Sequence, residues 1–480
     1  MKKILILMIL FPLVCFGQTN PHITQIGTFE NLAELRASAP SVSGVIGYIQ
    51  GHTTSGDGGG GRFQWVSDDS RDDDGGVIIK PTATLGNGRW VRQFTGPVNV
   101  KWFGATGDNS TDDYAAIRAA IDSSFGHSIY FPQGKYRVSQ TLDFDKYGMN
   151  VSGFSKSYSA GTLIQALAPF TGDSVIEVKA INVSIRDLSV IGSIGAEVEA
   201  IRITGNSQMT HIQDVIVRLS YVGVHLISGN AQRWVNVFAE SNRIGFQVSP
   251  DSGNNCNGGY HVGLRAFSSR EWGLKINQRE GGTGGMMSST WDISTEGGVV
   301  QSGSTGGGIS IGVNTGWYNM FTLYSESNAG PNFSILGNQD GNVFFFRNND
   351  NESLGVFDGW MTSAANSRTS IRSLNTEVYR VSSTVNATFG TTTTGRSHGT
   401  LFEYDYHLGG TANLAHLSSL RNGNHVYVRK VQSSGNLTLV SPTAGGFNLY
   451  GDSLTIASGS IGLWRIIRTG SSEAMVIREL

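Results

Sequence analysis

Three glutamates occupy the same position of a repeated pattern in the middle of this 480-residue chain. They lie in the segments Ala-Glu240-Ser-Asn, Ser-Thr-Glu296-Gly and Ser-Glu326-Ser-Asn, each at the end of an apolar, strand-like run. Paired carboxyl groups can act as a general acid and as a nucleophile or base, which is the chemistry that breaks a glycosidic bond. The sequence therefore indicates Glu240, Glu296 and Glu326 as candidate catalytic groups.

The glutamates belong to an irregular repeat between residues of about 150 and about 360, with a spacing of roughly 22 to 30 residues that suits one solenoid coil per repeat. Each repeat holds two short strands separated by a turn. The first strands are expected at 185–190, 212–217, 235–239, 262–266, 291–295 and 321–325, and the second strands at 223–226, 245–248, 273–276, 308–311 and 332–335. The repeat predicts stacked coils.

Alternate residues of a strand face opposite sides, so aligning the repeats separates the core from the surface. The residues expected to point inward are Val237, Leu264, Ile293 and Leu323, followed by Ala239, Ala266, Thr295 and Ser325. Their outward neighbours are Phe238 with Glu240, Arg265 with Phe267, Ser294 with Glu296, and Tyr324 with Glu326, and Arg218 holds the equivalent place one coil earlier.

Adjacent coils are about 4.8 Å apart, so Glu296 and Glu326 are expected about that close at Cβ, with Glu240 roughly 10 Å from Glu296. Like charges this near raise the pKa of one carboxyl group and leave an acid beside an ionised partner. The close pair approaches the separation found in retaining glycosidases, and the wide pair that of inverting ones. Tyr324 is a further candidate catalytic group, and the candidate substrate-binding residues are Arg218, Arg265, Phe238, Phe267 and Trp291.

Simpler explanations stand beside this hypothesis. Each glutamate could be a solvated strand end entering a polar turn, with no catalytic role. Asp187 and Asp214 share a repeat position before a core strand and are expected to serve turns. Because most aromatic residues of a solenoid pack in its core or rim, about one sugar platform is expected among four tryptophans. These are Trp234, Trp272, Trp291 and Trp317.

Elimination would need other groups, namely a base for the proton beside a uronate carboxylate and a cation to neutralise that carboxylate. Arg218, Arg265, Lys275 and Tyr324 could supply them. Calcium needs several converging acidic ligands, and the strip has three glutamates without clustered aspartates, so neither calcium nor another cofactor is expected. His211 and His261 stand apart from any carboxylate cluster, which argues against zinc.

Composition limits the other classes of function. The chain has 64 glycines against 10 prolines, which favours many short strands and turns. Charged residues make up 15% of the chain and the formal net charge is −2, so no basic field exists to bind nucleic acid or an anionic membrane. An all-β protein is expected.

The N-terminal residues predict export. Two lysines precede an apolar run, and small Gly17 comes before Gln18, which indicates a secretory signal peptide over residues 1–17. Cys256 is the one cysteine expected in the mature chain, so no disulfide can form within it. No later apolar stretch is long enough to span a bilayer, so membrane insertion is not expected.

Residues 98–142 run from a short strand through a Gly-Asp turn into one amphipathic helix, then through two strands. The helix is expected at about 112–124, opened by Thr111-Asp112-Asp113 and packed through Ala115, Ile117, Ala120 and Ile121. The segment resembles the opening of the pectate-lyase-like superfamily, in the rhamnogalacturonase/epimerase-like branch that includes phage tailspikes. The matching motifs are 103–105, 107–108, 111–113, 130–132 and 134–136.

The resemblance implies an all-β, right-handed parallel β-helix that is capped by this helix. The expected domains are a small β module at 18–97, the β-helix at 98–365 and an antiparallel β module at 366–480. A secreted carbohydrate-active enzyme that cleaves a polysaccharide is expected, with hydrolysis slightly favoured over lyase-type β-elimination. A non-catalytic glycan-binding spike or adhesin is the alternative, and the tailspike resemblance also implies a homotrimer.

Overall fold

The computed structural model describes residues 26–82, 86–123, 125–251, 253–277, 285–299, 306–312, 316–330, 333–335 and 342–346, and beyond these a series of separate strands. The signal peptide and the boundary predicted at 365 lie outside the described residues. The chain divides into two compact units, residues 1–95 and 96–480. The break lies just before the predicted boundary at residue 97. No helix among the described residues has the length and apolar character needed to cross a membrane.

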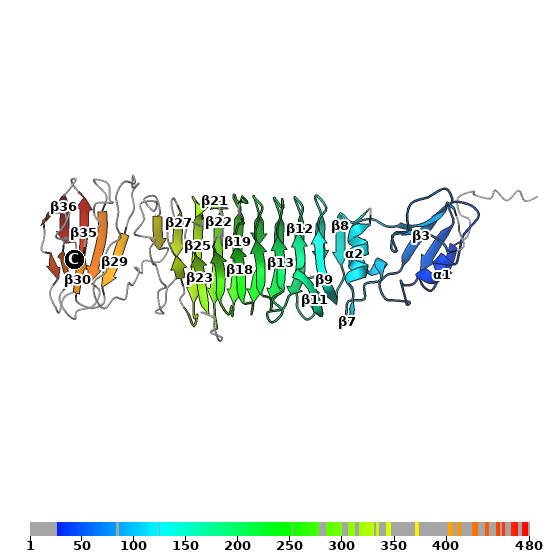
Figure 1. The fold of residues 1–480 in the computed structure, drawn as a ribbon, viewed down its shortest axis with the longest axis horizontal. Coiled ribbons are helices and arrows are strands. Elements are labelled where there is room, and N and C mark those ends of the chain that lie inside the picture. The colour runs from blue at the N-terminus through cyan, green and yellow to red at the C-terminus, as the bar shows by residue number, and fades with distance from the viewer. Residues whose placement is uncertain are drawn as a thin grey trace, which may run out of the picture. The chain divides into compact units, whose positions relative to one another are not determined.

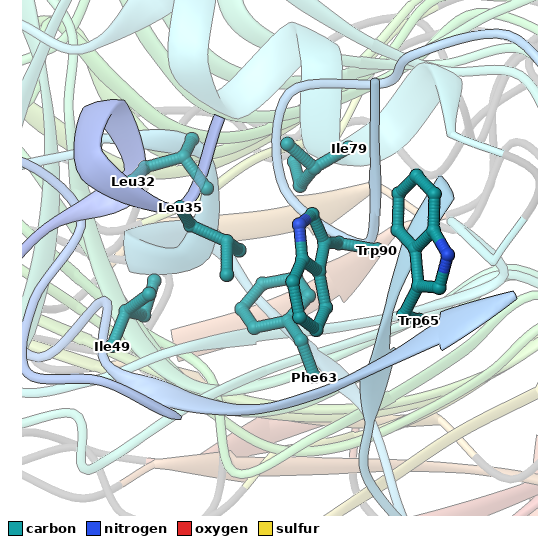
Figure 2. Close-up of a cluster of buried hydrophobic side chains, with 7 residues drawn as sticks. All are labelled: Leu32, Leu35, Ile49, Phe63, Trp65, Ile79 and Trp90. Carbon is teal, nitrogen blue, oxygen red and sulfur yellow. The ribbon is translucent and has the colours of Figure 1, made fainter. Parts of the chain in front are cut away.

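The first unit is a small sheet with the strand order β1-β2-β3-β5-β4 and one short helix, α1 (Leu32–Arg36), which the sequence did not predict. Its strands are β1 (Ile26–Phe29), β2 (Ile46–Ile49), β3 (Gly61–Val66), β4 (Ile78–Ile79) and β5 (Arg89–Gln93). Figure 2 shows its core, in which Trp90 packs edge-on against Trp65 with ring centroids 5.5 Å apart. The unit thus has its own apolar core, built from Leu32, Leu35, Ile49, Phe63, Trp65, Ile79 and Trp90.

The second unit contains a parallel β-helix, whose stacked strands are seen in Figure 1. It begins with β6 (Val98–Asn99), the 3-10 helix η1 (Val100–Phe103), β7 (Asp108–Asp112), α2 (Tyr114–Asp122), β8 (Ser128–Phe131), β9 (Gly134–Phe144), β10 (Asn150–Gly153) and β11 (Thr162–Val178). The coils that follow match the predicted repeat. This confirms the predicted all-β parallel β-helix.

Two series of strands alternate along these coils, and each strand pairs in parallel with its counterpart one coil later. The first series is β12 (Ser184–Ile191), β14 (His211–Arg218), β16 (Arg233–Val235), β17 (Phe238–Glu240), β19 (Tyr260–Phe267), β22 (Thr290–Glu296), β25 (Met320–Glu326), β27 (Val343–Phe346) and β28 (Ser370–Ser373). The second is β13 (Glu199–Ile203), β15 (Val222–Leu226), β18 (Ile244–Val248), β20 (Trp272–Ile276), β23 (Gly307–Ile311) and β26 (Phe333–Ile335). A two-stranded sheet joins β21 (Met286–Met287) to β24 (Gly316–Trp317).

The two series approach each other closely where small residues face one another. A Cβ atom added at Gly245 would lie 2.9 Å from the Cβ of Ala266, and one at Gly273 would lie 2.5 Å from Cγ2 of Thr295. Both distances are shorter than van der Waals contact. Gly245 and Gly273 of the second series therefore leave room for the side chains of Ala266 and Thr295 of the first series. This close packing restricts how the two strands of a coil can be placed against each other.

Helix α2 packs against η1 and β9 through the buried residues Ile117, Ala120 and Ile121, as predicted. It is shorter than the predicted span of 112–124, and Ala115, expected on the apolar face, is exposed. Asp112 accepts a hydrogen bond from the Tyr114 amide, but Asp113 instead accepts from the amides of Thr106 and Gly107. One aspartate therefore caps the helix and the other closes the preceding turn.

The remaining described strands form a five-stranded sheet, β29-β31-β35-β36-β33, and a three-stranded one, β30-β32-β34. The pairs β31–β35 and β35–β36 are antiparallel, as predicted, whereas β29–β31 and β33–β36 are parallel. These strands are β29 (Phe402–Tyr406), β30 (Gly410–Asn413), β31 (His425–Lys430), β32 (Leu437–Val440), β33 (Asn448–Gly451), β34 (Thr455–Ile456), β35 (Gly462–Arg468) and β36 (Glu473–Arg478).

Candidate functional site

The strand register brings the predicted outward residues into two adjacent columns. One column, here called the glutamate column, contains Arg218, Glu240, Phe267, Glu296 and Glu326, each paired with the next across neighbouring strands. The adjacent column holds Phe238, Arg265, Ser294 and Tyr324. The predicted alignment is confirmed, because these paired residues are the ones that the aligned strand motifs placed in the same columns.

Burial supports the predicted directions of these side chains. The residues that alternate with the columns are buried, including Ala239, Leu264, Ile293 and Leu323. Phe267, in contrast, is 42% exposed. Arg265 and Glu296 are also exposed, whereas Glu240, Glu326, Phe238 and Tyr324 are partly exposed.

Arg218 and Glu240 form an ion pair at one end of the glutamate column. The Arg218 Nε atom lies 3.0 Å from Oε2 of Glu240, and the guanidinium carbon lies 4.6 Å from the ring centroid of Tyr158. Lys135 Nζ lies 5.2 Å from the same ring centroid, and Tyr158 is 43% exposed. Tyr158 thus extends the column, although it lies in a turn before the first aligned strand at 185–190, where alignment of the repeats could not find it.

Glu296 and Glu326 are direct neighbours on β22 and β25, so their backbones lie about 4.8 Å apart. Within the described part of the chain, neither carboxylate takes part in an ion pair. The three glutamates therefore have different surroundings, since Glu240 pairs with a cation and the other two are neighbours in the strand register. This arrangement leaves Glu296 and Glu326 available for proton transfer and for nucleophilic attack.

The prediction that Trp291 binds substrate is wrong. Trp291 is 0% exposed, and its ring centroid lies 4.0 Å from that of His261 and 5.9 Å from that of Trp234. Trp234 and Trp272 are buried as well, and the side chain of Trp317 lies outside the described residues. The alternation that places Ile293 and Thr295 inside also places Trp291 inside, so this signal was present in the sequence.

Asp187 and Asp214, which were expected to serve turns, lie inside the strands β12 and β14. Both have left-handed backbone angles, with φ of 59° and 53°, at a repeat position that interrupts the strand alternation. Asp214 also accepts a hydrogen bond from Lys156 at 2.9 Å, and this bond lowers the pKa of its carboxyl group. These aspartates therefore mark a local irregularity within β12 and β14, where the parallel register skips them.

His211 and His261, the two histidines considered as zinc ligands, do not lie in a metal-binding cluster of the described residues. Among the described residues, no group of three or more His, Cys, Asp or Glu side chains is arranged to hold a metal ion. His261 lies inside the coils between Trp234 and Trp291, and burial lowers its pKa to about 3. It therefore packs as a neutral ring.

A second polar set lies on the other series of strands. Glu271 pairs with Arg243 at 3.0 Å and with Lys275 at 2.5 Å. Burial would raise the pKa of Glu271, but the hydrogen bonds and charges of Lys275 and Arg243 lower it. Lys275, a predicted lyase group, is on β20, so the structure does not bring it into the columns of Arg218, Arg265 and Tyr324.

The same strands carry a hydrogen-bonded group of Glu199, His225 and Ser249 that repeat alignment did not reveal. The three residues occupy different repeat positions, so they form no column in the sequence. His225 did lie within a predicted strand, 223–226. Its polar partners become visible only from the folded coils.

Comparison with known proteins agrees with this architecture. Residues 28–95 match a family described as "Phage tail protein small four-stranded beta-sheet domain". Residues 97–309 match the family "Rhamnogalacturonase A/epimerase, pectate lyase-like". The two matches coincide with the N-terminal sheet and with most of the described β-helix.

Two similar relatives come from Azotobacter vinelandii. Mannuronan C5-epimerase AlgE3 is 51% identical over 51 residues, which are 10% of this chain and 3% of that protein. Alginate lyase 7 is 57% identical over 44 residues, or 8% of this chain and 5% of that protein. The match thus spans only a small fraction of these relatives' length.

A solved structure, the gp42 tailspike of Acinetobacter phage vb_AbaP_AS12, is similar across most of both chains. It superposes with a TM-score of 0.57 over 94% of this chain and 91% of that one, at 12% sequence identity. Identity this low shows a shared fold alone. The family match over residues 97–309, which covers less than half of the chain, agrees with this parallel β-helix fold.

Proposed function

We propose that this protein is a secreted carbohydrate-active enzyme that hydrolyses glycosidic bonds of a polysaccharide, with Glu296 and Glu326 as its catalytic pair. The observation that carries the proposal is their register, which puts two carboxylates side by side on adjacent strands. Secretion rests on the predicted signal peptide, and assembly as a homotrimer rests on the tailspike resemblance.

In this mechanism one carboxylic acid protonates the glycosidic oxygen while the other carboxylate attacks the anomeric carbon. The covalent intermediate is then hydrolysed by a water that the first residue activates as a base. The strand spacing of about 4.8 Å approaches the separation of about 5–5.5 Å found in retaining enzymes. The wider Glu240–Glu296 pair is less suitable, because Arg218 already engages Glu240.

The neighbouring side chains could hold a sugar chain across these carboxylates. Phe267 lies directly beside Glu296 in the column and exposes its ring, which can stack on the apolar face of a sugar. Arg265 and Tyr324 lie in the adjacent column and offer hydrogen-bond donors. The Arg218–Glu240 pair and Tyr158 continue the polar row on the other side of Phe267.

Elimination is the second candidate, favoured by the epimerase and lyase names of the short-segment relatives. A lyase acting on a uronate-containing glycan would use Arg265 to neutralise the carboxylate and Tyr324 as the base. These residues lie two strands apart in one column, roughly 10 Å by the strand spacing. No calcium ion is required by this scheme.

The test combines a polysaccharide panel, including mannuronan and alginate, with Glu296→Gln and Glu326→Gln variants. A lost general acid or nucleophile should lower the rate of cleavage by at least about 10²-fold. Glu197→Gln is the matched control, because this exposed glutamate lies in the turn between β12 and β13, several coils before Glu296, and the variant should cleave at the wild-type rate. Ultraviolet absorbance by an unsaturated uronic end distinguishes elimination from hydrolysis.

Two outcomes would reject the proposal. If both glutamine variants keep more than a tenth of the wild-type rate, the catalytic pair is wrongly assigned. If wild-type protein binds a glycan of the panel without breaking it, the chain is a glycan-binding spike or adhesin.

A further inference from the structure

Glu199, His225 and Ser249 form a continuous hydrogen-bonded chain across three consecutive coils. His225 Nδ1 lies 2.8 Å from Oε1 of Glu199, and His225 Nε2 lies 2.6 Å from Oγ of Ser249. Glu199 begins β13, His225 lies on β15, and Ser249 directly follows β18. The parallel ladder β13-β15-β18 holds the three side chains at these distances.

The chemistry of the groups sets the direction of the proton chain. If Glu199 is ionised, its carboxylate is only an acceptor, and the matching tautomer of His225 carries the proton on Nδ1 and donates it to Glu199. In the neutral ring Nε2 is then an acceptor, and the Ser249 hydroxyl donates to it. A serine whose proton points at an imidazole that a carboxylate orients is the arrangement of an activated nucleophile.

His225 faces away from the core of the coils. It alternates on β15 with Val224 and Leu226, which are completely or almost completely buried. Its neighbour in the register is Arg202, whose side chain forms an ion pair with the well-exposed Asp173. On the other side, His225 lies beside the partly exposed Gln247. The group therefore lies just beneath the outer surface.

The bonding of Ser249 differs from that of other buried serines in this chain. Ser189, Ser207 and Ser228 donate to backbone carbonyl oxygens, which is the usual way to satisfy a hydroxyl in a turn. Within the described residues, Ser249 Oγ bonds to His225 alone. Glu199 Oε2 is buried and has no hydrogen-bond partner there. The Ser249 hydroxyl, unlike the other three, is therefore not used to satisfy a backbone carbonyl.

We propose that Ser249, His225 and Glu199 form a second catalytic centre, which hydrolyses small acyl esters such as O-acetyl groups carried by a glycan. Ser249 Oγ attacks the acyl carbon while His225 Nε2 takes its proton. The ester C–O bond breaks, and the alcohol leaves with that proton. Water, deprotonated by His225, then cleaves the acyl-serine to release the carboxylic acid and restore the hydroxyl.

The surroundings of Ser249 limit the size of the acyl group and include a side-chain amide. Ser249 is 3% exposed, so the proposed substrates are limited to small acyl groups such as acetyl. The Asn277 backbone amide donates to Val248 O, which places Asn277 opposite Ser249 one coil later. A side-chain amide beside the nucleophile is a group that can stabilise a developing oxyanion.

The test uses the full-length protein, p-nitrophenyl acetate and a small fluorophosphonate probe. The probe should label Ser249, as identified by peptide mass spectrometry, and Ser249→Ala should lose the label. The same variant and His225→Gln should hydrolyse p-nitrophenyl acetate at least about a hundredfold more slowly, because removing a triad member normally costs more than that. Ser228→Ala, which removes another buried hydroxyl, should keep both label and rate.

A folded wild-type protein that takes no label at Ser249 would overturn the proposal. So would a Ser249→Ala variant that hydrolyses the acetate at the wild-type rate. Circular dichroism and the thermal midpoint separate loss of activity from loss of folding. Glu199→Gln supplies a further check, because it keeps the side-chain shape and should slow hydrolysis while Ser249 is retained.

Discussion

At the scale of single residues, one strand carries both buried core side chains and an exposed candidate catalytic side chain. On β22, Trp291 and Ile293 are completely buried, whereas Glu296 at the end of the same strand is exposed. The difference follows from the alternation of side chains along a strand. A titratable side chain that points into the core must then be in its neutral form, and His261 is such a side chain.

His261 should make the stability of the protein depend on pH. Its pKa is lowered to about 3 in the folded chain, against about 6.5 in the unfolded one. The neutral form is thus favoured by folding, so stability is complete above about pH 6.5 and falls as the pH drops towards 3. Between pH 7 and pH 5 the loss should be about 2 kcal/mol.

The measurement is denaturant unfolding of wild type and His261→Phe at both pH values. Phenylalanine keeps an aromatic ring between Trp234 and Trp291 and removes the titrating group. Its stability should therefore fall by about 2 kcal/mol less than that of wild type between pH 7 and pH 5. An equal fall in both proteins would contradict the assignment of a neutral, buried His261.

At the scale of elements, buried asparagines hold the turns that end the first-series strands. Asn242 lies between β17 and β18 and is 0% exposed. Its Oδ1 accepts from the Ser220 amide at 2.9 Å, and its Nδ2 donates to the Val217 carbonyl at 3.1 Å. One side chain therefore ties the turn of its own coil to the turn of the preceding one.

Asn242→Ala should lower the free energy of unfolding by about 2–4 kcal/mol, because it leaves two buried backbone groups without partners. The control is Asn206→Ala, at an exposed turn position, which should change stability by less than about 0.5 kcal/mol. Denaturant unfolding monitored by circular dichroism compares the two. Equal effects would show that the Asn242 bonds do not hold the turn.

At the scale of the whole molecule, the chain consists of two compact units, divided after Thr95. The first has its own aromatic core around Phe63, Trp65 and Trp90, seen in Figure 2. The β-helix has a separate ladder of inward residues that runs from coil to coil. Units with separate cores are expected to unfold as separate cooperative steps.

Phe63→Ala should therefore destabilise one step selectively. Phe63 is 0% exposed, and truncating a buried phenylalanine typically costs about 3–5 kcal/mol. Calorimetry of the full chain should show one transition shifted to lower temperature and the transition of the β-helix unchanged. A shift of both transitions by the same amount would indicate a single cooperative unit.

The class of fold, most strand positions and the two outward columns follow from the amino-acid sequence alone. They depend on local properties, since side chains alternate along a strand with a period of two and each coil repeats the same apolar strand motif despite its varying length. This is why the repeated strand motifs are enough to align Glu240, Glu296 and Glu326 with Phe267. The capping helix likewise follows from its amphipathic spacing.

The contacts between side chains at different repeat positions, in contrast, were decided by the tertiary structure. Tyr158 reaches Arg218 from a loop, and Glu199, His225 and Ser249 meet although no shared repeat position links them. Such contacts depend on the three-dimensional course of turns and bends, where left-handed residues such as Asp214 interrupt the alternation. Register is a local property of strands, whereas contacts across different repeat positions exist only once the coils have stacked.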